Sequence, residues 1–389
     1  MQPTETNDKS GRYIVEAVAR ACDVLEAFRT DGETLRLCDI ADRTGLSMST
    51  AFRILYTLER RGLVEQSQNR AYRLNLRPLK RRKYKFGYGS QSSEFSFSRT
   101  VSESIQRVAF EEGIDLTVLD NRYSAKVAIR NADLFIRERV DIIIEFQSDE
   151  HCASIISSKL HDAQIPFIAV EIPHPGATYY GANNYRAGLL GGRYLAKWAV
   201  QNWKGKVDEI ILLELPMAGA LPKSRISGTL AAVRETLPVI DSQVVILDGN
   251  GQFEHSLEAV RKHLRKTKSR RVLVAAVNDP SAIGALRAFQ EAGRVEHCAV
   301  MGQNASAEAR SEIRNSKSRL IGSVAYFPER YGEAIIPLAI GILQGKATPP
   351  AVFVKHQLVT PDTVDCLYPE DPLLSGADPT FMLACDKHA

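Results

Sequence analysis

The sequence predicts two units: a small, mainly helical unit with a β hairpin, and a large α/β unit whose two parallel-sheet lobes enclose a cleft. Residues 39–62 carry the pattern of a helix, a tight turn and a second helix, and a short hairpin pattern follows at 63–74. From Tyr84 onward, apolar strand-like runs alternate with amphipathic stretches. Such an alternation is typical of doubly wound parallel sheets with helices on both faces.

Composition narrows the class of protein. The chain has 389 residues, of which 44% are hydrophobic and 25% charged, as in an ordinary globular protein with a sizeable core. No apolar run is long enough to cross a membrane, and no secretory signal is visible at the N-terminus, so we expect a cytoplasmic protein without membrane contact. The six cysteines are scattered without a Cys-x-x-Cys pair, which favours reduced thiols and no metal site.

The charge is divided unevenly along the chain. Residues 1–85 hold 17 Lys and Arg against 11 Asp and Glu, which leaves 33 basic and 35 acidic side chains of the totals of 50 and 46 for the remainder. This asymmetry favours a nucleic-acid partner for the first unit only. An ordinary solvated surface can carry a similar excess.

The first unit begins with an amphipathic helix at residues 13–28, and the helix-turn-helix pattern follows. Gly45 permits a left-handed turn, and Ser47 is a suitable N-cap for the second helix. That helix buries one stripe and begins with short polar groups and a cation, as a recognition helix does where it meets base edges. The candidate DNA-contacting residues of this helix are Ser47, Met48, Ser49, Thr50 and Arg53.

A hairpin pattern completes the unit. Residues 63–65 and 71–74 read as strands around a polar turn, the arrangement of a wing. Arg70 and Arg73 are placed to meet phosphate. A two-helix hairpin in an ordinary core is the alternative to DNA binding for the helical part alone.

Residues 11–76 together resemble the IclR-family winged helix-turn-helix. The resemblance depends on the order and spacing of four stretches, residues 18–28, 37–46, 49–58 and 62–65. It implies a DNA-binding domain that binds operator DNA as a homodimer. The following residues 77–83 form a basic linker, either a further phosphate contact or a solvated tether.

The second unit, residues 84–360, shows nine strand-like runs, at 85–88, 116–119, 141–146, 166–170, 209–215, 244–247, 271–277, 298–301 and 320–325. Nine strands are many for one open sheet, and a polar break at 181–186 suggests two lobes. We expect lobe 1 at about 84–184 and 328–353, and lobe 2 at about 185–327 and 354–360. Residues 361–389 read as a tail of loops without a functional interpretation.

This unit resembles the type 1 periplasmic-binding fold of ribose-binding protein and of lactose-repressor-family effector domains. Four stretches carry the resemblance, residues 181–188, 224–228, 277–286 and 300–304. It implies a sugar, polyol or related small polar effector between the lobes, held by aromatic walls and a few polar groups. The ligand-binding positions that it implies are Phe95, Phe97, Glu171, Arg225, Asn278, Asn304 and Tyr326.

Some of these positions allow other interpretations. Phe95 and Phe97 could be core residues, and Arg225 a surface residue. The chain also departs from the family pattern, because Glu171-Ile172 stands where the family has an Asp-Arg pair and Asn304 replaces an aspartate. Both departures argue against a plain pentose or hexose.

The sequence lacks the motifs of common enzyme classes, including the Gly-x-Ser-x-Gly, phosphate-loop, dinucleotide-binding and His-Glu-x-x-His patterns. We therefore expect no catalysis and no cofactor. The interpretation is a ligand-responsive, DNA-binding transcription regulator, acting as a repressor. The alternatives are a solute-binding receptor module without a DNA-binding role and a sugar-modifying enzyme.

Overall fold

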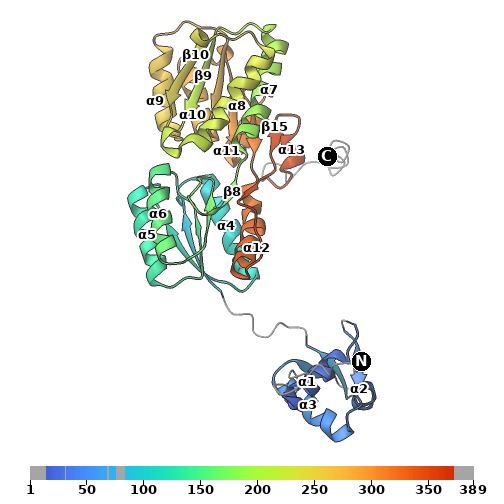
Figure 1. Ribbon diagram of the computed structural model, residues 1–389. Helices are drawn as coiled ribbons and strands as arrows, with labels where there is room; N and C mark the ends of the chain where they lie inside the picture. The colour runs from blue at the N-terminus through green and yellow to red at the C-terminus, as the bar shows by residue number, and fades with distance from the viewer. Residues whose placement is uncertain (1–14, 31, 68–69, 76–83, 372–389) are drawn as a thin grey trace, which may run out of the picture. The chain divides into compact units, whose positions relative to one another are not determined.

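The computed structural model describes residues 15–30, 32–67, 70–75 and 84–371 (Figure 1). The chain divides into two compact units, Met1–Lys83 and Tyr84–Ala389. The expected linker, residues 77–83, lies outside the described residues. Each unit has a hydrophobic core of its own, so each is described by itself.

The first unit is a winged helix-turn-helix, as predicted. Its elements are α1 (Glu16–Glu26), β1 (Thr34–Arg36), α2 (Leu37–Thr44), α3 (Met48–Arg60), β2 (Val64–Gln66) and β3 (Ala71–Leu74). Within the described residues the strands form an antiparallel sheet in the order β1-β3-β2. Strand β1 was not predicted from the sequence, because it has three residues and only Leu35 among them is buried.

The turn between α2 and α3 forms for the expected reasons. Gly45 has φ +68°, a conformation that a Cβ would oppose. The Ser47 hydroxyl accepts a hydrogen bond from the Thr50 backbone N–H at 3.3 Å and caps α3. On the inner face of α3, Ala51, Leu55 and Leu58 are buried against α1, α2 and the sheet.

Lobe 1 of the second unit is built on a sheet whose described strands run in the order β14-β8-β7-β6-β4-β5, all parallel. Helices α5 (Ala125–Arg137) and α6 (Glu150–Asp162) cover one face, and α4 (Ser96–Glu111) and α12 (Tyr331–Leu343) cover the other (Figure 1). The strands are β4 (Lys85–Ser90), β5 (Asp115–Asp120), β6 (Ile142–Glu145), β7 (Phe167–Val170), β8 (Thr178–Gly181) and β14 (Ala351–Phe353).

Lobe 2 has the described strand order β10-β9-β11-β12-β13-β15, in which only β15 is antiparallel to its neighbour. Helices α7 (Asn184–Trp203) and α8 (Ala220–Thr236) cover one face, and α9 (Phe253–Leu264), α10 (Asp279–Glu291) and α11 (Ala307–Arg314) the other (Figure 1). The strands are β9 (Glu209–Glu214), β10 (Val244–Asp248), β11 (Val272–Ala276), β12 (Cys298–Asn304), β13 (Leu320–Ala325) and β15 (Gln357–Val359).

All nine runs that the sequence predicted form strands, and they are divided between two sheets. Strands β8, β14 and β15 were not predicted. They are three or four residues long, and β14 and β15 lie at sheet edges. The chain passes between the lobes three times, after β8, after β13 and after β14, and these three segments form the hinge.

The chain beyond residue 360 does not begin as a loose tail. Helix α13 (Val364–Leu367) lies there, and Tyr368 is buried in the core of lobe 2. The Asp371 carboxylate accepts hydrogen bonds from Arg310 and Arg314 of α11 at 2.6 to 2.8 Å. Up to Asp371 the expected tail is therefore part of lobe 2, and residues 372–389 lie outside the described residues.

Two further features bear on the class of protein. Cys22, Cys38, Cys152 and Cys298 are free thiols, whereas Cys366 is disulfide-bonded, so the expectation of reduced thiols is wrong for this residue. Among the described residues, no helix has the length and hydropathy needed to span a bilayer, and no cluster of His, Cys, Asp and Glu is suited to a metal ion.

Candidate functional site

The outer face of α3 presents the residues expected to contact DNA. Met48, Ser49 and Arg53 are exposed, and Thr50 is half-buried behind them. The Ser47 side chain is exposed but is also the N-cap. The helix start is therefore free for contact with a partner, while its inner face is held in the core.

Two aromatic residues of this face were not among the sequence candidates. Phe52 and Tyr56 are 49% and 48% exposed. Arg60 donates to the Tyr56 hydroxyl at 3.0 Å and lies 5.4 Å from the centre of its ring. The signal was the four-residue spacing of Met48, Phe52 and Tyr56, which places them in one row on the helix surface.

The hairpin carries its two candidate arginines differently. Arg73 on β3 is ion-paired with Glu65 on the adjacent strand β2. Arg70 is exposed, with φ +56° in the turn. Of the two, Arg70 offers the more available charge, because the carboxylate of Glu65 already compensates Arg73.

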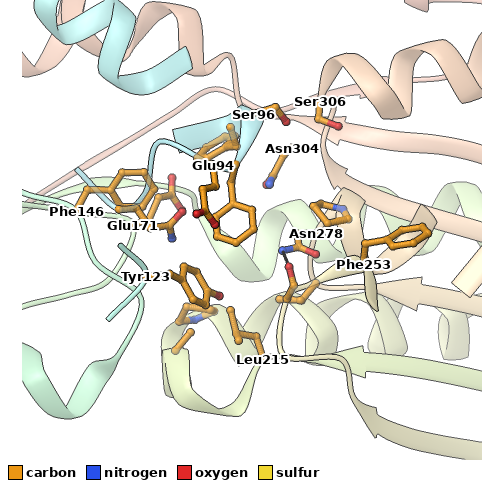
Figure 2. Close-up of a pocket in the computed structure, with 18 of the residues that line it drawn as sticks. Glu94, Ser96, Tyr123, Phe146, Glu171, Leu215, Phe253, Asn278, Asn304 and Ser306 are labelled. Atoms are coloured by element: carbon orange, nitrogen blue, oxygen red, sulfur yellow. Dashed lines mark hydrogen bonds between the residues drawn. The ribbon is translucent and has the colours of Figure 1, made fainter. Parts of the chain in front are cut away.

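In the second unit, a cavity of about 370 Å³ lies between the two lobes. Six of the seven predicted ligand-binding residues line it: Phe95, Phe97, Glu171, Arg225, Asn278 and Asn304. Figure 2 shows side chains from both lobes around this space, with Tyr123 and Phe146 of lobe 1 on one side and Phe253 of lobe 2 on the other. They meet because the carboxyl ends of parallel strands in both lobes open toward the same crevice.

Aromatic rings form the lobe 1 wall of the cavity. Phe95 is the N-cap residue of α4, and Phe97 lies in the first turn of that helix. Phe95 packs edge-on against Tyr123 at 5.1 Å between ring centres, and Phe97 packs edge-on against Tyr331 at 5.9 Å. Rings held in this way present a fixed apolar surface to a bound molecule.

Arg225 of α8 is 6% exposed, and its guanidinium is held by several partners. It donates to the Asn184 Oδ1 at 2.9 and 2.6 Å and to the Val277 carbonyl oxygen at 2.5 Å. It also lies 4.8 Å from the centre of the Tyr326 ring. The surface interpretation of Arg225 is therefore wrong.

Glycines set the position of Arg225. Gly188 and Gly192 of α7 face α8, and a Cβ at either position would overlap with the backbone of Arg225 or Thr229. Close packing of α7 on α8 accounts for the glycine-rich segment 188–192. The close approach carries the Arg225 side chain deep between the helices and the strand ends.

Glu171 follows β7 and is buried where the hinge segments meet. Its Oε1 accepts hydrogen bonds from the Tyr331 hydroxyl at 2.5 Å and from the Ala182 backbone N–H at 3.2 Å. Its Oε2 lies 3.8 Å from the Arg225 guanidinium. Burial raises the pKa of Glu171 above its ordinary value, against the opposing effect of Arg225. This carboxyl therefore links both lobes and also lines the cavity.

Asn278 and Asn304 lie on the lobe 2 side. Asn278 caps α10, because its Oδ1 accepts from the Ser281 backbone N–H at 3.0 Å, and its Nδ2 donates to the Gly251 carbonyl oxygen at 2.8 Å. Asn304 ends β12 with φ +103°, a sparsely populated conformation of the kind found at functional sites. Its amide has no hydrogen-bond partner among the described residues, so it is available to a ligand.

Tyr326 is the predicted residue that does not line the cavity. It is 1% exposed, its hydroxyl donates to the Gln303 Oε1 at 3.0 Å, and Arg225 lies over its ring. The chain turns into the hinge directly after β13, which carries this side chain into the core of lobe 2. Tyr326 therefore packs against the Arg225 guanidinium from behind the cavity lining.

The sequence reasoning missed several lining residues, including Gln91, Glu94, Tyr123, Phe253 and Glu308. Glu94 directly precedes Phe95 in the same polar loop. Its position next to a predicted lining residue could have identified it. Glu308 and Phe253 lie in helices that follow strand ends, and no motif marks them. Ser96 donates to the Glu308 Oε2 at 3.0 Å, which joins the two lobes at the mouth of the cavity.

Comparison with known proteins agrees with this architecture. Residues 86–347 match the periplasmic binding protein domain, and residues 17–68 match the IclR helix-turn-helix domain. The ribose import binding protein RbsB of Salmonella typhimurium is 24% identical over 255 residues, 64% of this chain and 81% of that protein. The HTH-type transcriptional regulator XynR of Escherichia coli K12 is 35% identical over 69 residues, 18% of this chain and 27% of that protein.

Solved structures share the fold of the second unit. A solute binding protein from Actinobacillus succinogenes with bound D-allose has a TM-score of 0.63 at 19% identity, over 73% of this chain and 99% of that one. A solute binding protein from Bacillus halodurans with bound myo-inositol has a TM-score of 0.63 at 18% identity, over 73% and 96% of the two chains. The chain therefore belongs to the periplasmic binding protein domain family, and it carries an IclR helix-turn-helix domain ahead of that domain.

Proposed function

We propose that this protein is a ligand-responsive transcription regulator, a repressor that acts in the cytoplasm and senses a sugar, polyol or related small polar metabolite. The observation that carries the proposal is the presence in one chain of a helix-turn-helix with an exposed recognition face and a lobed domain with a cavity of about 370 Å³. A receptor that only delivers solute has no use for the first unit.

The proposed binding mode uses aromatic walls and a small number of fixed polar groups. Phe95 and Phe97 pack against the C–H faces of the ligand, and Asn304 and Asn278 bond its hydroxyls with the hydrogen-bonding capacity that remains to them. Arg225 and Glu171 position the surrounding strand ends. The relatives with bound D-allose and myo-inositol support a ligand of this size and polarity.

The proposed response acts through the hinge. His356 joins the hinge segments, because its Nε2 accepts from the Asn183 backbone N–H at 3.1 Å and its Nδ1 lies 3.4 Å from the Ala325 carbonyl oxygen. A ligand that prefers one arrangement of the lobes shifts the population toward that arrangement. In a homodimer, this shift changes the spacing of the two recognition helices and hence the affinity for operator DNA.

The DNA contact is proposed for Ser47, Met48, Ser49, Thr50 and Arg53 at base edges and for Arg70 and Arg73 at phosphates. We add Phe52 and Tyr56 because they are half-exposed on the same face of α3. The proposed homodimer predicts a palindromic operator.

The test begins with selection of duplex DNA by the full chain from a random pool. A palindromic sequence should be enriched, and a sugar or polyol that raises the melting temperature should change the affinity for that sequence. Light scattering would measure the dimer directly. If no sequence is enriched although a sugar binds, the protein is a solute-binding module and not a regulator. Recovery of a chemically altered sugar would indicate an enzyme instead.

A further inference from the structure

The cavity lining holds more carboxylates than cations, which binding of a neutral sugar does not require. Three carboxylates line it, those of Glu94, Glu171 and Glu308, and Arg225 is the single cation among the described lining residues. Arg225 lies 3.8 Å from Glu171, so these two buried charges compensate each other. Glu94 and Glu308 have no ion pair with any cation of the described residues.

The carboxylates of Glu94 and Glu308 come from opposite lobes, and both lie at the mouth of the cavity. Glu94 lies in the loop before α4 of lobe 1, and Glu308 lies in the first turn of α11 of lobe 2. Glu308 accepts one hydrogen bond from the Ser96 hydroxyl, a neutral donor. The Glu94 carboxylate has no hydrogen bond or ion pair with any residue that the structure describes, and Figure 2 shows Glu94 among the residues around the cavity.

A molecule bound between Glu94 and Glu308 would displace water from these two carboxylates, which are exposed without it. Loss of hydration is unfavourable for an ionised carboxylate unless a hydrogen-bonded positive charge replaces the water. The guanidinium of Arg225 cannot provide this charge. Its N–H groups donate to Asn184 and Val277, and the Tyr326 ring lies against its face. Among the described lining residues no other cation is present, so a positive charge beside Glu94 and Glu308 is left to the ligand.

We propose that the effector is an amino sugar or amino polyol, whose protonated amine lies between Glu94 and Glu308 while its hydroxyl-bearing carbons pack against Phe95 and Phe97. This inference rests on the proposed function, because it names the class of the sensed ligand. An ammonium group provides three donors in one place, which suits two carboxylates facing it from opposite lobes. The same contact favours the closed arrangement of the lobes, since both partners must approach the amine.

The experiment compares matched amine and hydroxyl compounds with the full chain by calorimetry, at a pH that keeps the amines protonated. The pairs are D-glucosamine with D-glucose, D-galactosamine with D-galactose, and D-glucamine with D-sorbitol. We expect an amine to bind about tenfold or more tightly than its partner. Raising the salt concentration should reduce the preference, because Glu94 and Glu308 are exposed.

Three variants assign the preference to these residues. Glu94→Gln and Glu308→Gln should each reduce the preference for the amine over its hydroxyl partner several-fold. The amide oxygen of Glu308→Gln can still accept the hydrogen bond from Ser96. Glu103→Gln, which removes an exposed carboxylate of α4 outside the cavity, should leave the preference unchanged. An unchanged melting temperature without ligand shows that each variant is folded.

The outcomes separate the two proposals. If the neutral members bind as tightly as the amines, or if the preference survives in both cavity variants, the amine assignment is overturned and the sugar-sensing function stands. If no member of any pair binds, the sugar and polyol class is overturned together with the amine assignment.

Discussion

The recognition helix and the inter-lobe cavity present their polar groups in opposite ways. On α3, Met48, Ser49 and Arg53 project from the surface, and the fold does not depend on them because the helix is held by its inner face. In the cavity, Arg225 and Glu171 are at least nine-tenths buried, and each bonds to groups from several elements.

Exposed residues of α3 and buried residues of the cavity should therefore respond differently to substitution. An exposed contact residue can change without loss of the fold, whereas a buried polar residue leaves its partners unsatisfied when it is removed. Substitutions on α3 should therefore affect DNA binding alone, and substitutions in the buried network should affect unfolding first.

The largest effect is expected for Arg225→Met, which leaves Glu171, Asn184 and the Val277 carbonyl without their partner. Breaking a buried ion pair costs roughly 3–5 kcal/mol of unfolding free energy. Both tryptophans of the chain lie in α7, so their fluorescence during urea unfolding reports on the second unit. Arg193→Met, which removes an exposed partner of Glu235, should have a much smaller effect, because solvent screens this ion pair. Equal losses in the two variants would contradict the contrast.

A pH-dependent effect is expected for Glu145, which is buried at the end of β6 and bonded to the Asn121 amide at 2.8 Å. Burial raises its pKa to about 8, from 4.5 as the ordinary value. The native state therefore keeps this proton between about pH 4.5 and pH 8 while the unfolded state loses it, so stability falls as pH rises through this window.

Glu145→Gln removes this dependence. Its free energy of unfolding relative to the parent protein should rise between pH 5 and pH 8 by roughly 2–4 kcal/mol, at up to about 1.4 kcal/mol per pH unit. Urea unfolding at each pH measures the difference, and Glu103→Gln serves as the exposed control. A difference that stays constant with pH would show that Glu145 is ionised in the native state.

A smaller effect, on DNA binding only, is expected for Arg53→Ala. Loss of one base-edge or phosphate contact by a cation should weaken binding to the selected duplex about tenfold, equivalent to about 1.4 kcal/mol. Ligand binding and the melting temperature should not change. Arg130→Ala removes an exposed cation of α5 in the second unit and should leave DNA affinity as it is. Fluorescence anisotropy distinguishes these results, and an unaffected Arg53 variant would remove this residue from the interface.

The smallest effect is expected for Tyr56→Phe. This change keeps the exposed ring and removes the hydroxyl that accepts from Arg60 at 3.0 Å. The hydrogen bond is exposed, so stability should change by less than about 0.5 kcal/mol. DNA affinity should change only a few-fold if the hydroxyl positions Arg60 near the duplex. Loss of DNA binding as large as in Arg53→Ala would assign the hydroxyl itself to a direct contact.

Much of the fold was accessible from the sequence because local patterns encode it. The apolar runs at 209–215 and 271–277 predict buried strands, and the stripe of Ala51, Leu55 and Leu58 predicts the inner face of a helix. The short strands β14 and β15 were missed because they form by pairing with segments distant in sequence, β8 and β13.

The site was predicted in part. Phe95, Phe97, Glu171, Arg225, Asn278 and Asn304 were identified through motifs and do line the cavity. Tyr326 was misplaced, because a position near a strand end does not determine which way the side chain turns. Glu94 and Glu308 were missed, because the two belong to opposite lobes and no motif contains either of them.

By itself the sequence determined the two units, the nine main strands and six of the residues that line the cavity, since periodicity and short motifs depend on neighbours along the chain. Only the tertiary structure decided which charges are compensated. Arg225 meets Glu171 because glycines let α7 and α8 approach closely, and Glu94 has no described partner where its loop reaches the mouth of the cavity. Pairing of charges is a property of distances in space, and spacing along the chain does not determine it.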